Sequence, residues 1–218
     1  MNRFFIASFL LAATPALGNV FTLDTLNRGW ITAGGTDNGN SNGNSYYAGI
    51  DFSSNDGLEL RNWFQFDLSP VSGTVSSASL VIDTGHFNAP GSVTSENYQL
   101  TSLGSSFGFA DLGTAALYGS RVYTRTDALA IRTIALNASA ISAIQSFGVF
   151  GLGGRLTTLL QSTADEAIFS GISGSPSNVQ LVVTTNNQAG TPEPASVLLA
   201  LSGLAVITGL RRVRQARY

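Results

Sequence analysis

Residues 58–70 read LELRNWFQFDLSP, and this stretch decides the fold class. Its apolar residues fall on one face of period two: Leu58, Leu60, Phe64, Phe66 and Leu68. The opposite face carries Glu59, Arg61, Trp63, Gln65 and Asp67. Because successive side chains of a strand point to opposite faces, the alternation predicts a half-buried β-strand that Ser69-Pro70 ends.

Further short β-rich runs follow, each bounded by Gly, Ser, Asn or Pro: VSSASLVIDTG (75–85), NYQLTSL (97–103), RVYTRT (121–126), IRTIALN (131–137), FGVFGLGG (147–154), EAIFSG (166–171) and VQLVVTT (179–185). Many short strands with polar turns indicate an antiparallel sandwich or barrel. We expect an all-β protein with an antiparallel, jelly-roll-like β-sandwich. One short helix interrupts it, because Asn137 is a good N-cap and Ile141 and Ile144 lie one turn apart before Gly148.

The stretch GGTDNGNSNGNSYYAG, Gly34 to Gly49, has too few apolar groups to be buried and predicts a long polar loop. Its alternating oxygen-bearing side chains raise calcium as a hypothesis, with Asp37, Asn40 and Asp51 as candidate ligands. An EF-hand is excluded, because a loop starting at Asn38 has Gly49 at the twelfth place, where a bidentate Glu is required. A loop without metal is the alternative.

The charge balance and the missing residue types exclude several classes of function. Residues 19–190 carry six arginines against twelve acidic residues, a net charge of −6, which argues against nucleic-acid binding. The absence of Cys excludes disulfides and thiolate zinc sites, and the single histidine, His86, excludes a multi-histidine metal site. The stretch around His86, IDTGHFNAPG, has no nucleophile elbow of the G-x-S-x-G kind. We assign no catalytic or metal-binding residue and expect no enzyme; a polysaccharide hydrolase or lyase built on carboxylates is the lower alternative.

The first 18 residues, MNRFFIASFLLAATPALG, have a basic residue at Arg3, an apolar run from Phe4 to Ala13 and small residues at Ala16 and Gly18. This order predicts a helical secretory signal peptide, cleaved after Gly18. We therefore expect export through the Sec translocon.

The chain ends in TPEPASVLLALSGLAVITGLRRVRQARY, from Thr191 to Tyr218. Residues 195–210 predict a transmembrane helix of about 24 Å, marginal for a bilayer. A basic tail, 211–218, follows it with Arg211, Arg212, Arg214 and Arg217. These arginines should stay cytoplasmic and leave the body outside the membrane.

The order of Pro192, Glu193 and Pro194, the apolar run and the arginines resembles a PEP-CTERM sorting signal. That family occurs in Gram-negative bacteria that secrete exopolysaccharide. The resemblance implies processing by exosortase, a membrane protease, and delivery to the cell surface or the extracellular matrix after a transient inner-membrane anchorage. The expected organisation is a signal peptide (1–18), a β-sandwich body (19–185), a linker (186–191) and a sorting module (192–218).

A second resemblance lies in the body. WFQFDLSPVSGTVSSASLVIDTG, Trp63 to Gly85, is similar to a segment of DNRLRE-type surface domains, β-sandwich modules of which some relatives bind carbohydrate. The resemblance implies a β-sandwich fold and a location at the cell surface, and it assigns no site residue.

Three functions follow in order of expectation. The first is an exported, non-catalytic envelope or matrix protein associated with exopolysaccharide or biofilm. The second is a carbohydrate-binding module, in which Trp63 with Tyr46 and Tyr47 forms a stacking platform for sugar rings. A sandwich buries only one face of each sheet, so Trp63 is either solvent-facing, as this function requires, or covered by a loop. The hydrolase or lyase is the third.

Overall fold

The computed structural model describes residues 18–146, 148–160, 164–172 and 174–186. They belong to one compact unit, Gly18–Asn186. The predicted signal peptide up to residue 17, the linker from residue 187 and the whole sorting module lie outside the described residues. In the part of the chain that is described, no helix has the length and apolar character needed to cross a membrane.

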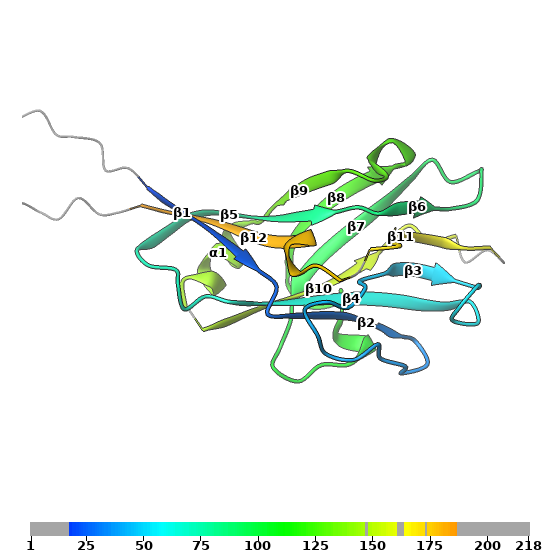
Figure 1. Ribbon diagram of the computed structural model, residues 1–218, viewed down its shortest axis with the longest axis horizontal. Helices are drawn as coiled ribbons and strands as arrows, with labels where there is room; N and C mark the ends of the chain where they lie inside the picture. Colours follow the sequence, from blue (N-terminus) through cyan, green and yellow to red (C-terminus); the bar gives the residue numbers. More distant parts are fainter. Residues whose placement is uncertain (1–17, 147, 161–163, 173, 187–218) are drawn as a thin grey trace, which may run out of the picture. The chain divides into compact units, whose positions relative to one another are not determined.

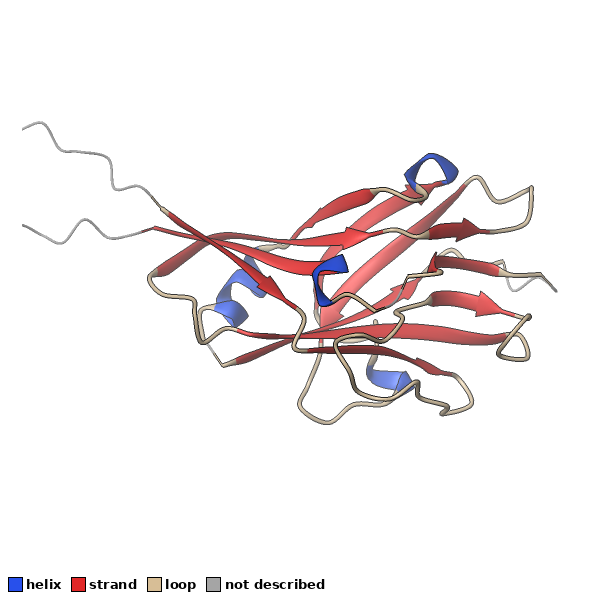
Figure 2. Cartoon of the chain, viewed as in Figure 1, coloured by secondary structure: helices blue, strands red, loops and turns tan. Residues whose placement is uncertain are grey.

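The described chain is all-β, with strands in antiparallel sheets and one short α-helix (Figures 1 and 2). The smaller sheet has the order β1-β12-β5-β9, formed by β1 (Asn19–Asp24), β12 (Val179–Asn186), β5 (Thr74–Asp83) and β9 (Ile131–Ala135). Figure 1 shows β12 lying between β1 and β5. The last described strand is therefore hydrogen-bonded along both of its edges.

The larger sheet has the order β6-β11-β3-β4-β10-β7-β8, with β2 added on β4. Its strands are β2 (Asn27–Thr32), β3 (Ala48–Asp51), β4 (Leu58–Asp67), β6 (His86–Asn88), β7 (Ser95–Ser102), β8 (Leu117–Thr124), β10 (Val149–Leu156) and β11 (Glu166–Ser170). Leu60 of β4 pairs with both Gly49 of β3 and Thr32 of β2, so these two strands lie on opposite edges of β4.

One hydrophobic core joins the two sheets. Leu80, Ile82 and Leu181 of the smaller sheet belong to the same buried cluster as Phe64 and Leu152 of the larger one. Two antiparallel sheets that share a core in this way are consistent with a β-sandwich.

The alternation that decided the fold class is confirmed in β4. Phe64, Phe66 and Leu68 are buried in the main core, and Leu60 is fully buried as well. Leu58, at the first position of the strand, is 36% exposed. The strand ends at Asp67, one residue before the predicted Ser69-Pro70 stop.

The inner face of β4 also holds one polar residue, Asn62, which is fully buried. Its Nδ2 donates to the carbonyl of Tyr46 at 2.9 Å, and its Oδ1 accepts from the Tyr98 hydroxyl at 2.7 Å. Buried polar groups are tolerated when they are hydrogen-bonded in this way. Asn62 therefore ties the start of β3 to β7 through β4.

The predicted helix is confirmed as α1 (Ala138–Ile144). Asn137 caps it, since its side-chain oxygen accepts from the amide of Ala140 at 3.1 Å. Ile144 is fully buried and Ile141 packs against the same core.

The region before residue 58 contains more structure than the polar loop we predicted. It holds β1, β2 and β3, and the loop itself is tied to β2 by isolated bridges from Ser41 to Arg28 and from Asp37 to Ile31. Asn38 adds side-chain contacts, because its Oδ1 accepts from the Trp30 amide at 2.9 Å and its Nδ2 donates to the carbonyl of Ser45 at 3.0 Å. Hydrogen bonds from asparagine therefore help to hold this loop on the body, together with the buried ring of Tyr46.

Candidate functional site

The outer face of β4, turned away from the main core, carries a second and smaller apolar cluster. Ile31, Trp63 and Leu112 are buried in it, and Leu103, Phe107 and Phe109 pack around them. Leu103, Phe107, Phe109 and Leu112 belong to residues 103–113, which we call the cover segment. This segment lies over the middle of the larger sheet.

Glycines on both sides of Trp63 make room for the indole and its cover. In the strand register, Gly29 of β2 and Gly153 of β10 are the two direct partners of Trp63. A Cβ at Gly29 would lie 3.1 Å from Trp63 Cζ2, and one at Gly153 would lie 3.1 Å from Leu112 Cδ2. Larger residues would press against the ring or lift the cover segment.

Trp63 is therefore covered by a loop, the second of the two arrangements we expected. The side chain is 1% exposed, and its ring centroid lies 5.1 Å from that of Phe107. No described residue accepts a hydrogen bond from the indole Nε1.

The predicted sugar-stacking platform of Trp63, Tyr46 and Tyr47 is wrong. Tyr46 is fully buried in the main core, with its hydroxyl donating to the carbonyl of Asp83 at 3.0 Å, and burial raises its pKa well above the ordinary value. Tyr47 points the other way, and its hydroxyl accepts from the amide of Gly171 at 3.2 Å. Adjacent residues on an extended chain face opposite sides, so Tyr46 and Tyr47 cannot share one surface.

The structure does not bring the candidate calcium ligands together. Asp37 bridges to β2, whereas Asp51 lies in β3 on the opposite edge of β4. Three inter-strand spacings separate Asp37 from Asp51, about 14 Å, which is too far for one ion bound at about 2.4 Å. Asn40 lies in the same loop as Asp37. Within the described ranges, no group of three or more His, Cys, Asp or Glu side chains is placed to hold a metal ion.

Both aspartates instead stabilise local turns. Asp37 accepts from the amide of Gly39 at 2.9 Å. The Asp51 carboxylate accepts from Ser53, Ser54 and Asn55. Burial alone would raise the pKa of Asp51, but the hydrogen bonds from these residues hold it below the ordinary value.

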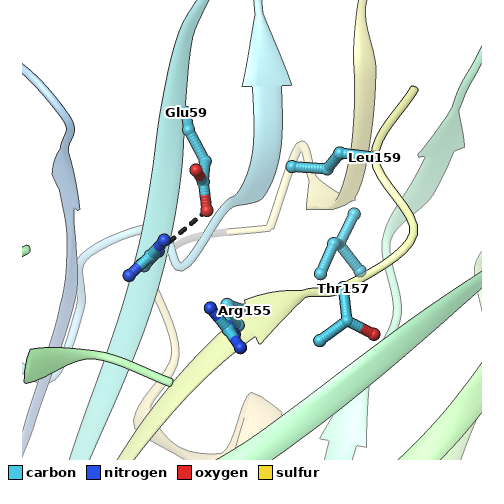
Figure 3. A pocket seen from close by; sticks show the side chains of 6 residues that line it. Glu59, Arg155, Thr157 and Leu159 are labelled. Atoms are coloured by element: carbon cyan, nitrogen blue, oxygen red, sulfur yellow. Dashed lines mark hydrogen bonds and ion pairs between the residues drawn. The ribbon is translucent and has the colours of Figure 1, made fainter. Parts of the chain in front are cut away.

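A polar pocket of about 200 Å³ lies on the larger sheet (Figure 3). It is lined by Glu59, Arg61, Arg155, Leu156, Thr157 and Leu159. Figure 3 shows Glu59 coming from β4 and Arg155 from β10, on two sides of the same space. β4 and β10 pair up to Asn62 and Gly154, and the pocket opens directly beyond this last pair.

The two arginines of the pocket differ in how they are held. Arg61 Nε donates to Glu59 Oε1 at 2.8 Å, and its Nη1 donates to the carbonyls of Leu112 at 3.1 Å and Phe109 at 3.3 Å. Its Cζ also lies 4.1 Å from the centroid of the Phe109 ring. Arg61 is thus occupied in fixing the cover segment to β4.

Arg155 is the cation that the pocket leaves available. No described residue accepts a hydrogen bond from its side chain, and its Nε is buried. Its aliphatic stem is the surface that a Cβ at Gly113 would meet. The guanidinium is therefore positioned by packing, without an acidic partner.

A pair of buried carboxyl groups lies beside this pocket. Glu96 of β7 and Glu166 of β11 are both fully buried, and the two side chains interact with each other. The Thr158 hydroxyl donates to Glu96 Oε2, while the Leu160 amide donates to Glu166 Oε1 and Oε2 at 2.9 and 3.0 Å. Glu96 Oε1 accepts no hydrogen bond from any described residue.

Burial, and after it the carboxylate of Glu166, raises the pKa of Glu96 to about 7, against the lowering effect of the Thr158 hydrogen bond. Two carboxylates in one desolvated space cannot both ionise without a large cost, so the pair holds a shared proton below that pH.

Sequence reasoning named Glu59 and Arg61 in other connections but missed Arg155, Glu96 and Glu166. A signal was present for two of them. Glu96 stands in phase with Tyr98 and Leu100, which predicts an acid on an inner face, and Arg155 stands in phase with Gly151 and Gly153 on an outer face without side chains. Nothing in the sequence indicates that Glu96 and Glu166 meet.

Among the described residues that line this pocket, Glu59 is the one carboxylate, and the histidine lies elsewhere. His86 is exposed in β6, and Asp83 accepts from the amide of Gly85 at 3.1 Å. Comparison with protein-family models and with curated proteins finds no match for the chain.

Proposed function

We propose that the protein is an exported, non-catalytic component of the cell envelope or extracellular matrix, sorted through Pro192-Glu193-Pro194 and associated with exopolysaccharide or biofilm. The observation that supports it is where the folded unit ends. β1 starts at Asn19, next to the expected signal cleavage after Gly18, and β12 ends at Asn186, the first residue of the predicted linker. Removal of either end would leave every described strand in place.

The partners in this proposal are the Sec translocon and an exosortase-type membrane protease, with inner-membrane anchorage before release to the surface or matrix. For the body we propose a jelly-roll-like sandwich. In its support, the chain changes sheet between β4 and β5, β8 and β9, and β11 and β12, so neighbouring strands are mostly distant in sequence.

Mass spectrometry of the mature protein from a Gram-negative host with an exosortase tests the sorting proposal. We expect an N-terminus at Asn19 and loss of the tail that contains Arg211, Arg212, Arg214 and Arg217. Replacing Pro192, Glu193 and Pro194 with alanine should retain the C-terminus at Tyr218, because the extended, charged motif that a protease cleft would read is gone. The matched control is the unchanged chain in a host that lacks the exosortase. A wild-type C-terminus still at Tyr218 in the exosortase host would overturn the proposal.

We propose carbohydrate binding as a second function, at the polar pocket rather than at the predicted aromatic platform. Two observations favour it. Arg155 offers a guanidinium without an acidic partner among the described residues. Glu59 binds Arg61 through Oε1, and its Oε2 is a second acceptor on the same carboxylate. A cation and a carboxylate oxygen in one small pocket suit a ligand with an anionic group and hydroxyl groups, such as a sugar acid.

Arg155→Gln should weaken binding of trigalacturonate to the full chain at least about tenfold, the loss expected when a charge-assisted hydrogen bond of about 1.5 kcal/mol is removed. Isothermal titration measures it. Arg125→Gln is the matched control, because Arg125 donates to the carbonyls of Ala89 and Pro90 and does not line the pocket. Equal binding of the neutral methyl ester of trigalacturonate would contradict an anion site.

A hydrolase or lyase is the remaining alternative, and the carboxyl pair is the feature that bears on it. Both carboxyls are fully buried and bonded to Thr158 and to the Leu160 amide, so we propose that they support the structure. Polysaccharide turnover by the wild type that is lost in Glu96→Gln would overturn this assignment.

A further inference from the structure

The segment Thr157–Leu160 links the pocket to the carboxyl pair. Thr157 and Leu159 line the pocket, whereas Thr158 and the amide of Leu160 bond to Glu96 and Glu166. Alternate residues of an extended segment face opposite sides. One side of this short stretch is therefore a pocket wall, and the other is anchored on two carboxyl groups.

The segment is also held by Leu159, which packs against the main core, and by hydrogen bonds to β7. The Thr157 amide donates to the carbonyl of Asn97 at 2.9 Å, and the Asn97 amide donates to Thr158 Oγ1 at 2.9 Å. These bonds do not change with protonation. The carboxyl pair is thus the part of the attachment that responds to pH.

The groups around the pair supply no compensating cation. The residue opposite Glu96 on β8 is Tyr123, and burial raises its pKa, so it stays neutral. Arg121, two residues earlier on β8, donates to Asp127 at 3.2 Å. The residue opposite Glu166 on β3 is Ile50, which is apolar. Within the described residues, Glu166 is the acid that faces Glu96, and no arginine pairs with either carboxylate.

We propose that the Glu96–Glu166 pair is a proton-dependent tie that holds Thr157–Leu160 in place, so that loss of the shared proton loosens the pocket wall. The effect of this tie on saccharide binding rests on the function proposed above. The tie itself does not depend on that function. When the proton leaves, two buried negative charges face each other and Glu96 Oε1 still has no donor.

The direction of the pH effect follows from the raised pKa of Glu96. While Thr157–Leu160 is attached, Glu96 keeps its proton up to about pH 7. A detached, solvated Glu96 would have a pKa near its ordinary value of 4.5. The tie is at full strength below pH 4.5, weakens as pH rises, and levels off above pH 7. The equilibrium constant for detachment should rise about tenfold per pH unit in that interval, about 300-fold in all.

Nuclear magnetic resonance of the full chain between pH 4.5 and 8.5 measures this at the Leu160 amide. We expect an inflection near pH 7 in the wild type and none in Glu96→Gln, which mimics the protonated acid. At pH 8 the amide of the variant should exchange with solvent up to about 300-fold more slowly than that of the wild type. Asp56→Asn is the matched control, because Asp56 is exposed at a positive φ of 53° that asparagine tolerates. It should keep the wild-type inflection.

Thr158→Val is a second variant that does not alter the acids. It removes the hydrogen bond that lowers the pKa of Glu96, so the inflection should move above pH 7. An inflection that persists in Glu96→Gln, or that fails to move in Thr158→Val, would overturn the tie.

Titration with trigalacturonate at pH 6 and pH 8 tests the consequence. Affinity should fall at pH 8 in the wild type and stay constant in Glu96→Gln. If the Leu160 inflection behaves as expected but no uronate binds at either pH, the saccharide proposal fails and the tie stands. If uronate binds with the same pH profile in both proteins, the regulatory inference fails and the saccharide site stands.

Discussion

Replacing Trp63 with alanine is expected to lower the free energy of unfolding by about 3–5 kcal/mol, the range measured for large aromatic residues removed from well-packed sites. Trp63 is 1% exposed and lies between Gly29 and Gly153 under the cover segment. Removal of the indole leaves a cavity between two strands that have no side chain there to fill it. Urea unfolding followed by circular dichroism measures the loss.

Trp30 provides the matched control, since it is the other tryptophan and is only half-buried, with its Nε1 donating to Ser45 Oγ at 3.0 Å. Trp30→Ala should cost clearly less than Trp63→Ala. A Trp63→Ala protein within about 1 kcal/mol of the wild type would show that the cover segment does not depend on the ring. Any loss of sugar binding in Trp63→Ala must therefore be compared with its loss of folding.

Replacing Asn62 with alanine is expected to destabilise the fold by about 2–4 kcal/mol, because it leaves the Tyr98 hydroxyl and the Tyr46 carbonyl buried without their partner. Tyr98→Phe removes the hydroxyl itself, so no unpaired hydroxyl is left in the core, and it should cost about 1 kcal/mol. The double variant should then be more stable than the sum of the two losses predicts.

The same urea titrations measure this cycle, with an expected coupling of about 1 kcal/mol between Asn62 and Tyr98. Additive losses would mean that the hydroxyl has another acceptor when Asn62 is absent. Such a result would contradict the view that Asn62 is the link between β3, β4 and β7.

Local patterns were sufficient to predict the fold class but not the position of individual side chains. The alternation in β4 correctly placed Phe64 and Phe66 in the core, and Asn137 correctly marked the start of α1. These features depend on neighbours within a few residues. The strands before residue 58 were not predicted, because β2 and β3 are short and are defined by their pairing with β4.

The candidate site could be predicted only in part because its residues meet through long-range contacts. The outward phase of Trp63 was correct, but the cover segment that buries it begins 40 residues later in the chain. The pairing of Glu96 with Glu166 depends on how the end of β10 leads into β11, which no periodicity describes. The separation of the calcium candidates could not be predicted for the same reason, since Asp37 and Asp51 are close in sequence and lie on opposite edges of β4.

The central position of β12 has a mechanical consequence for a protein held by its C-terminal side. A pull on Asn186 reaches the body through β12, which is paired with β1 along residues 19–24 and with β5 along residues 74–82. The load is divided between two ladders of hydrogen bonds. An edge strand would be peeled away from a single neighbour. β12 must instead be freed from both neighbours before the core opens, so a force applied at Asn186 meets the resistance of both ladders.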